Sequence, residues 1–263
     1  MVVLDVHAQV NLKEVDLINI FSYFYSMNFF DKVTVIIPTY NEEYYIYNTL
    51  WLLSRQGHKL KVIVADGGST DRTIKMVLNA REKFQNLSID IIQGGAVGVG
   101  RNNGAKFADT QYLLFMDADS ILIEDDIIEQ TLKISDQYDI ITCKQKSTTQ
   151  EDRKSVWTYR IFNWIRQVMP ETFCTGCYFF ISKKKFMELG GFDESLNNSE
   201  DFWLSRQVPK KRFKILDRYV GQDNRRFKKM GYWPFIKIVL LNYWYKNNIN
   251  WFKKDVGYWE PYN

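Results

Sequence analysis

Two aspartates separated by a single residue, Asp117 and Asp119, follow the apolar run at 112–116. Two carboxylates with this spacing after a buried strand can divide their work. One can reach a sugar hydroxyl or orient the loop, while the other holds a hard divalent cation that is also bound by phosphate oxygens and water. The same spacing arises by chance and often caps a following helix, so this pair alone leaves a structural role open.

A glycine-rich segment at 94–104, GGAVGVGRNNG, suggests a second binding element. It does not match GxGxxG, it lacks GK[ST], and it follows the third expected strand instead of the first, which excludes a dinucleotide or P-loop motif. What remains is a loop that leads into a helix N-terminus with Arg101 beside it, an arrangement that suits a phosphate or a nucleotide. An ordinary surface turn is the alternative.

The elements that must position these residues alternate between apolar strands and helices. Expected strands cover 33–38, 61–66, 88–93 and 112–117, and expected helices cover 42–55, 71–84 and 100–108. Continuous Val and Ile runs separated by helices are typical of an α/β fold with a mainly parallel central sheet and helices on both faces. Ligands bind outside the carboxyl ends of such strands, so we expect the polar residues after the strands to converge on one edge.

The second half of the chain is less regular. We expect a helix at 155–168, a strand at 175–181, a loop at 190–199, a strand at 213–220 and an apolar helix at 232–245. The last is fourteen residues long and contains Lys237, which is too short for a membrane span of about 20 residues and indicates a core or interfacial helix. We predict an amphipathic N-terminal segment at 1–31, a catalytic domain at 32–222 whose donor half ends near residue 120, and a basic aromatic helical segment at 223–263.

Composition and charge narrow the class of protein. The chain has 263 residues, 46% hydrophobic and 25% charged, which excludes a disordered protein. Residues 206–254 contain fourteen Lys and Arg against two acids, while residues 1–205 carry a net charge of −6. This asymmetry suggests an anionic partner such as a phosphate, nucleic acid or membrane surface, although a solvated basic face is also common.

The cysteines and the N-terminus predict little chemistry. Cys143, Cys174 and Cys177 have no histidine near them in the sequence, since only His7 and His58 occur, so a structural zinc site is not expected. We interpret the cysteines as packing residues or at most one disulfide. The first ten residues lack the basic start and apolar core of a signal peptide, which predicts a cytoplasmic protein.

Six segments in order resemble the family 2 glycosyltransferases, which are inverting enzymes with a GT-A fold. They are VTVIIPTYNEE, VIVADGGSTDRT, GVGRNNGAKFA, YLLFMDADS, GGFDE and SEDFWLSRQ, and the resemblance extends from residue 33 to about 231. It implies that a nucleotide-sugar donor binds at the carboxyl edge of the sheet. It also implies Mn²⁺ or Mg²⁺ as cofactor, with Asp119 as the metal ligand, and Asp201 as the general base beside Glu200. The donor-binding residues that it implies are Pro38, Thr39, Tyr40, Glu42, Asp66, Arg101, Asp117, Arg225 and Arg226.

These roles agree with the chemistry of sugar transfer. A departing diphosphate needs a cation and basic side chains, and the acceptor hydroxyl needs a carboxylate on the opposite face of the sugar. This arrangement gives a single displacement with inversion. Without the resemblance, Glu200 and Asp201 would also fit an acidic pair stabilised by a helix dipole.

Two departures from the family pattern refine the prediction. No histidine follows His58, so we expect Asp119, diphosphate and water to hold the metal. The QxxRW motif of processive synthases is absent, and the nearest string, Asp223-Asn224-Arg225-Arg226-Phe227, resembles the RRF element of some nonprocessive members. We therefore expect a metal-dependent inverting enzyme that moves one sugar from a UDP- or GDP-sugar to an acceptor hydroxyl or lipid phosphate.

Two other functions also fit parts of the sequence. A noncatalytic sugar-nucleotide or glycan-binding protein could keep the same scaffold. A nucleic-acid-binding module would use the basic aromatic segment but leave the carboxylates without a purpose, so no nucleic-acid partner is expected. The acceptor is expected to be a glycan or lipid-linked. The segment at 223–263 either contacts the inner face of a membrane peripherally or packs on the catalytic domain, with its basic residues serving the donor diphosphate.

Overall fold

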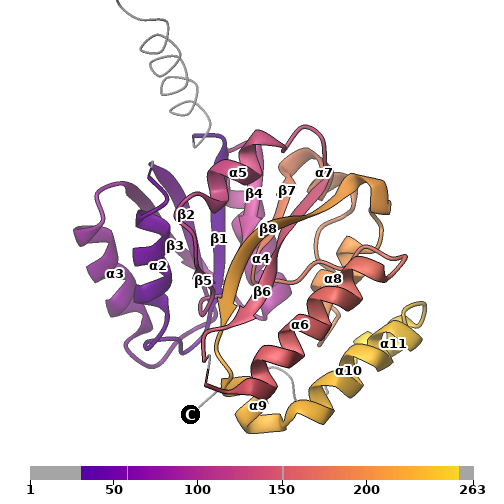
Figure 1. The fold of residues 1–263 in the computed structure, drawn as a ribbon. Helices are drawn as coiled ribbons and strands as arrows, with labels where there is room; N and C mark the ends of the chain where they lie inside the picture. The colour runs from indigo at the N-terminus through magenta and orange to yellow at the C-terminus, as the bar shows by residue number, and fades with distance from the viewer. Residues whose placement is uncertain (1–30, 58, 150, 255–263) are drawn as a thin grey trace, which may run out of the picture.

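The computed structural model describes residues 31–57, 59–149 and 151–254 (Figure 1). The amphipathic segment expected at 1–31 lies, apart from residue 31, outside the described residues and remains a prediction. The boundary expected at 222/223 also remains a prediction.

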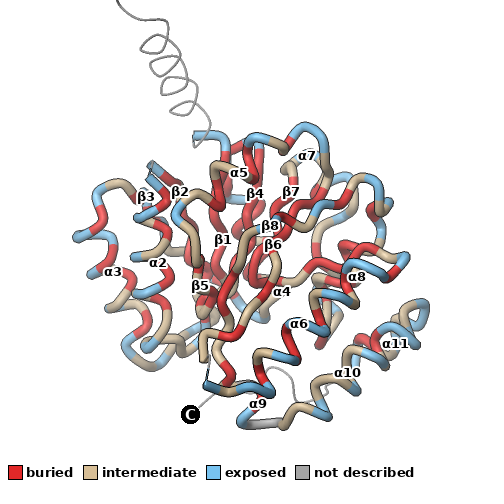
Figure 2. The backbone as a smooth tube through the Cα atoms, viewed as in Figure 1, coloured by how far each residue is buried: buried red, intermediate tan, exposed pale blue. Residues whose placement is uncertain are grey.

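The first half of the chain forms a parallel sheet. Its strands are β1 (Val33–Thr39), β2 (Leu60–Asp66), β3 (Leu87–Gln93) and β4 (Tyr112–Phe115), in the order β3-β2-β1-β4. The connecting helices are α2 (Ile46–Ser54), α3 (Thr73–Lys83) and α4 (Val97–Phe107). Side chains alternate across β1, so Val35 packs in the cluster with α2 and α3 while Ile36 packs with α4 on the other face. The expected helices on both faces are confirmed, and Figure 2 shows the strands buried between them.

The second half adds strands of mixed direction to the same sheet. The strands are β5 (Ile121–Leu122), β6 (Ile140–Ser147), β7 (Phe179–Ser182) and β8 (Phe213–Gln222), and the eight-stranded order is β3-β2-β1-β4-β7-β6-β8-β5. β7 runs antiparallel to β4 and β6, β6 and β8 are parallel, and β5 is antiparallel to β8. The helices of this half are α5 (Ile127–Lys133), α6 (Arg153–Val168), α7 (Lys183–Glu188) and α8 (Glu200–Ser205), with a 3-10 turn at Lys210–Arg212.

Three C-terminal helices lie beside α6: α9 (Arg225–Met230), α10 (Tyr232–Trp244) and α11 (Ile249–Phe252) (Figure 1). Phe252 is fully buried in a cluster with Phe162, Phe173 and Phe202, against which Val239 also packs. This part of the expected basic segment therefore packs on the catalytic domain. Among the described residues, no helix is long and apolar enough to cross a membrane.

The structure corrects several expected boundaries. The helix expected from residue 42 begins at Ile46, because the Glu42 carbonyl first closes a turn by accepting the amides of Tyr45 and Ile46. The strand expected at 175–181 begins only at Phe179, because the Tyr178 amide donates to the Thr175 carbonyl in a turn. The cysteines are free and buried, so the packing interpretation is confirmed.

Candidate active site

The loops after β1, β2 and β3 meet at one edge of the sheet, as expected. Thr39 and Asp66 are paired in register, and the amides of Gly67 and Gly94 donate to the carbonyls of Thr39 (2.8 Å) and Asp66 (2.7 Å). A Cβ at Gly94 would lie 2.6 Å from the Ala65 carbonyl oxygen, so the third loop approaches the second too closely for a side chain.

The Asp66 carboxylate organises its own loop. Its Oδ2 accepts the amides of Gly68 and Ser69 at 3.0 Å, and its Oδ1 accepts the Ser69 hydroxyl at 2.6 Å. The same hydroxyl accepts the Asn41 amide at 2.9 Å, which joins this loop to the one after β1. Asp66 thus fixes the shape of the edge where the nucleotide-sugar donor was expected to bind.

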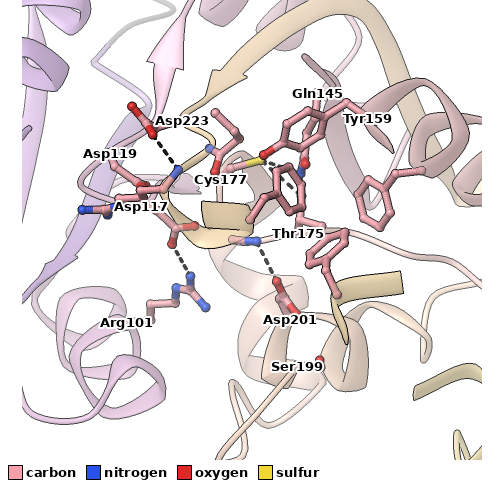
Figure 3. A pocket seen from close by; sticks show the side chains of 16 residues that line it. Arg101, Asp117, Asp119, Gln145, Tyr159, Thr175, Cys177, Ser199, Asp201 and Asp223 are labelled. Carbon is pink, nitrogen blue, oxygen red and sulfur yellow. Dashed lines mark hydrogen bonds and ion pairs between the residues drawn. The ribbon is translucent and has the colours of Figure 1, made fainter. Parts of the chain in front are cut away.

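One cavity of about 80 Å³ opens beside these loops and joins the two halves of the chain (Figure 3). Asp117 and Asp119 enter it from the end of β4, and Asp201 enters it from α8. The rest of its lining is formed by Arg101, Gln145, Tyr159, Phe162, Thr175, Gly176, Cys177, Ser199, Gln222, Asp223, Arg225, Phe227 and Phe235. Charged side chains from both halves of the chain therefore face one cavity.

Arg101 is the buried centre of a charge cluster on one wall. Its Nη2 donates to Asp117 Oδ1 at 2.7 Å, and its Nη1 pairs with Glu200. Burial acts to lower the pKa of Arg101, but the carboxylates of Glu200 and Asp117 outweigh burial and raise it. Burial also raises the pKa of Glu200, and the guanidinium opposes that shift. Glu200 is 3% exposed and lies behind Arg101, outside the cavity lining.

Asp201 presents its carboxylate to the cavity with both oxygens held by backbone amides. Oδ2 accepts the Gly176 amide at 2.7 Å and Oδ1 accepts the Phe202 amide at 2.7 Å. A Cβ at Gly176 would lie 2.0 Å from Arg101 Nη2 and 3.0 Å from Asp117 Oδ1. Glycine is therefore required where the Asp201 and Asp117 sides of the cavity approach each other.

Arg225 joins two carboxylates beside the same cavity. Its Nη2 donates to Asp119 Oδ2 at 2.7 Å, and its guanidinium donates to both Glu42 oxygens at 2.9 and 3.1 Å. The same guanidinium lies 4.2 Å from the centre of the Tyr45 ring. Burial raises the pKa of Glu42 to about 7, although Arg225 acts to lower it.

The oxygen donors in the cavity fit a hard divalent cation only with help from a substrate. Asp119 offers a carboxylate, but the described residues contain no group of three or more His, Cys, Asp or Glu that could hold a metal. Mn²⁺ and Mg²⁺ accept phosphate oxygens and water as remaining ligands. The site thus suits a cation that shares its coordination with a diphosphate.

The expected site residues fall into distinct groups. The cavity brings together Arg101, Asp117, Asp119, Asp201 and Arg225. The expected donor residues Pro38, Thr39, Tyr40 and Asp66 lie on the same sheet edge but do not line the cavity, and Glu42 reaches it through Arg225. The side chain of Arg226 lies outside what the structure describes.

Several lining residues were not expected from the sequence. Gln145 lies on β6, a strand that sequence patterns did not indicate, and donates to Thr175 Oγ1 at 2.6 Å. Tyr159 and Phe162 belong to the inner face of the helix expected at 155–168, but helical periodicity does not distinguish a packed face from a cavity wall. Phe227 and Phe235 reach the cavity from the C-terminal helices.

Related sequences place the chain among sugar-transferring proteins. It is 32% identical over 121 residues to the poly(ribitol-phosphate) beta-N-acetylglucosaminyltransferase TarS of Staphylococcus aureus, which covers 44% of this chain and 21% of that protein. It is 24% identical over 201 residues to the O-antigen chain rhamnosyltransferase RfbN of Salmonella typhimurium, which covers 70% of this chain and 63% of that protein. It is also 30% identical over 114 residues to the uncharacterized glycosyltransferase YfnE of Bacillus subtilis, covering 43% of this chain and 29% of YfnE. The chain thus spans less than a third of TarS and of YfnE.

Solved structures share the fold. The mannosyltransferase PcManGT from Pyrobaculum calidifontis, in complex with GDP-Man and Mn²⁺, superposes with a TM-score of 0.60 at 21% identity, over 77% of this chain and 59% of that one. S. aureus TarS 1-349 in complex with UDP-GlcNAc superposes with a TM-score of 0.56 at 23% identity, over 74% and 59%. These likenesses confirm the expected GT-A fold. The family model described as Glycosyl transferase family 2 matches residues 34–192, well over half of the sequence. The chain belongs to glycosyl transferase family 2.

Proposed function

We propose that this protein transfers one sugar from a UDP- or GDP-sugar to an acceptor hydroxyl or lipid phosphate, with inversion and with Mn²⁺ or Mg²⁺ bound. One observation carries the proposal. Asp117 and Asp119 enter the cavity from the end of a parallel strand, Asp201 enters it from α8, and Gly176 lies between the two groups. Inverting transfer requires a donor side and a basic group on the acceptor side around one reacting carbon.

The positions of the charged residues suggest how a donor would lie. The reacting carbon and the diphosphate would lie beside the carboxylates that line the cavity, and the nucleoside would extend outward along the loops after β1 and β2. Tyr40 is 47% exposed there, and the loop held by Asp66 forms the adjoining surface. Similar proteins have been solved with UDP-GlcNAc and with GDP-Man, so both nucleotides are reasonable probes.

Asp119 is the residue that would hold the cation, together with diphosphate oxygens and water. A bound Mn²⁺ or Mg²⁺ would neutralise charge that develops on the leaving diphosphate. Arg225 now donates to the Asp119 oxygen, so this side chain has to share or release that carboxylate when donor binds. Arg225 would then be placed to contact the diphosphate.

On the acceptor side, Asp201 takes the proton. The acceptor oxygen attacks the anomeric carbon while the bond from that carbon to the diphosphate breaks, and the acceptor proton moves to the Asp201 carboxylate. The amides of Gly176 and Phe202 fix the carboxylate without neutralising it. Arg101 and Glu200 act as positioning residues, because Arg101 binds Asp117 in the cavity wall and Glu200 binds Arg101 from behind it.

The test begins with a thermal-shift panel of UDP-, GDP- and dTDP-sugars, each with and without Mn²⁺, to find the stabilising donor. Release of free UDP or GDP on adding acceptor then separates a transferase from a protein that only binds sugar nucleotides. Turnover that persists in both Asp119→Ala and Asp201→Ala would contradict the proposal.

A further inference from the structure

The outer face of α6 carries an apolar stripe. Trp157, Ile161, Trp164 and Val168 are spaced by four, three and four residues, which places them on one side of a helix. All four are exposed, and the two tryptophans are 60% and 62% exposed. We call these four residues the α6 stripe.

The neighbouring helix α10 repeats this spacing on its own exposed face. The residues at this spacing are Trp233, Lys237, Leu240 and Trp244, so three of the four are apolar. Both tryptophans are 80% exposed. The two helices begin at the same end, since the Tyr232 hydroxyl donates to Asp152 just before α6. Figure 1 shows them side by side.

A shallow apolar groove connects the two exposed sets of residues. Ile161 of α6 and Leu240 of α10 line the same groove, which has a volume of about 30 Å³. The α6 stripe together with Trp233, Leu240 and Trp244 is named the docking face. A contiguous patch of large exposed apolar side chains marks an interaction surface.

Basic residues predominate on the two helices of the docking face, although Arg166 is buried and the acids Asp152 and Glu171 flank α6. Helix α6 contains four basic residues and no Asp or Glu, and residues 224–254 contain eight basic residues and no Asp or Glu. On α6, the Arg160 guanidinium lies 5.5 Å from the centre of the Trp157 ring. Exposed Trp on two helices that contain Lys and Arg and no Asp or Glu matches the interface of an anionic bilayer, where Trp enters the headgroup layer and cations contact the lipid phosphates.

We propose that the docking face binds an anionic lipid bilayer and that the acceptor is a lipid-linked molecule presented from that bilayer. The second part rests on the proposed function. Phe162 and Phe235 line both the catalytic cavity and the apolar groove, with ring centroids 6.1 Å apart. A single pair of rings therefore separates the docking face from the cavity, so an acceptor head group would have a short path from the membrane to Asp201.

Vesicle co-sedimentation of the full chain tests the surface. The chain should pellet with vesicles of phosphatidylcholine and phosphatidylglycerol but not with pure phosphatidylcholine. Binding should weaken from about 0.1 M to about 1 M salt, as the screening length falls from about 10 Å to about 3 Å. Trp157→Ala with Trp164→Ala should lower the partition coefficient about tenfold or more, because burial of apolar area is lost. Trp51→Ala is the matched control, since Trp51 is 40% exposed on α2.

A charge pair of variants tests the electrostatic part. Arg160→Glu with Lys237→Glu should abolish the preference for anionic vesicles, while Arg81→Glu with Lys83→Glu on α3 makes the same charge change far from the docking face and should leave it intact. Equal pelleting with neutral and anionic vesicles, or wild-type pelleting of the Trp157 and Trp164 variant, overturns the proposal.

The two proposals fail in different experiments. Donor binding by thermal shift should be unchanged in the Trp157 and Trp164 variant, and turnover should fall with a lipid-linked acceptor more than with a short water-soluble analogue. Vesicle binding without any nucleotide-sugar binding would defeat the proposed function and leave the surface in place. Donor turnover with no vesicle binding, or equal losses with both acceptors, would defeat the membrane inference alone.

Discussion

Arg225 and Asp119 form an ion pair of 2.7 Å although 106 residues separate them in the sequence. The same guanidinium binds Glu42, so one cation joins the loop after β1, the end of β4 and the start of α9. All three side chains are less than one fifth exposed, which strengthens their electrostatic interaction relative to a surface pair. The predicted metal site thus already contains a positive charge contributed by the chain.

Metal binding should depend on the nucleotide. With Arg225 on Asp119, Mn²⁺ affinity should be weak for the protein alone and rise at least several-fold when UDP or GDP supplies phosphate oxygens. Asp119→Asn should remove the nucleotide-dependent gain in Mn²⁺ affinity. Asp109→Asn, on the surface beside Lys61, should leave that gain unchanged. Titration calorimetry with and without nucleotide measures both, and equal Mn²⁺ affinity in the two conditions would contradict this prediction.

Asp201→Asn should lower kcat by about 10²- to 10⁴-fold while donor affinity changes little, because the residue acts on the acceptor proton in the transition state. Asparagine has the same shape and its single oxygen can still accept one of the two amide hydrogen bonds, so the fold should survive. Donor Kd and steady-state turnover are the two measurements, with Glu129→Gln on α5 as the control. A large loss of donor affinity would instead assign Asp201 to the nucleotide site.

The sequence predicted residue positions best where a single strand determines where the residue lies. Apolar runs placed β1, β2, β3 and β4, and the carboxyl ends of β2 and β4 placed Asp66, Asp117 and Asp119 on one edge. The second half was harder because β6 mixes apolar and polar residues and β5 has two residues. Neither gives a periodic pattern long enough to identify a strand.

Residue roles were hardest to predict where distant segments pair. Glu200 and Asp201 are adjacent and chemically alike, yet one is buried against Arg101, 99 residues earlier, and the other faces the cavity. Arg225 meets Glu42 across 183 residues. Local sequence does not encode such partners, because tertiary packing determines which carboxylate a buried guanidinium meets.

The buried pair of Arg101 and Glu200 should be important for stability. Removing one partner leaves an unpaired buried charge, so Glu200→Ala should cost about 3–5 kcal/mol of the free energy of unfolding. Glu200→Gln, which keeps the shape, should cost less and provides the measurement if the alanine variant does not fold. Urea unfolding gives both values. Asp109→Ala, which breaks the exposed pair with Lys61, is the control. If neither Glu200 variant lowers the free energy of unfolding more than this control does, the pair of Arg101 and Glu200 does not stabilise the fold.

Stability should fall as pH rises through the range in which Glu42 loses its proton. Burial raises the pKa of Glu42 from 4.5 to about 7, so the folded state holds a proton that the unfolded state has released. The free energy of unfolding is then highest below pH 4.5 and decreases towards pH 7, by up to about 3 kcal/mol from this group. Burial of Glu200 acts in the same direction.

Glu42→Gln should therefore flatten the dependence of unfolding free energy on pH between about 5 and 7, as measured by urea unfolding at several pH values. Glu43→Gln is the neighbouring control. Hydrogen bonds from Arg72 lower the pKa of Glu43, so its contribution is lost only as pH falls below 4.5 and its removal should leave the upper range unchanged. Identical slopes for wild type and Glu42→Gln would show that Glu42 is ionised throughout.

The link between Arg225 and Asp119 also has a consequence for the nascent chain. Translation adds about 5–20 residues per second, so Arg225 leaves the ribosome roughly 5 to 20 s after Asp119. The parallel strands β1 to β4 can pair during this interval, but the carboxylates of Glu42 and Asp119 must wait for their shared guanidinium. The order of synthesis thus completes the sheet edge before the cation that joins its loops is made.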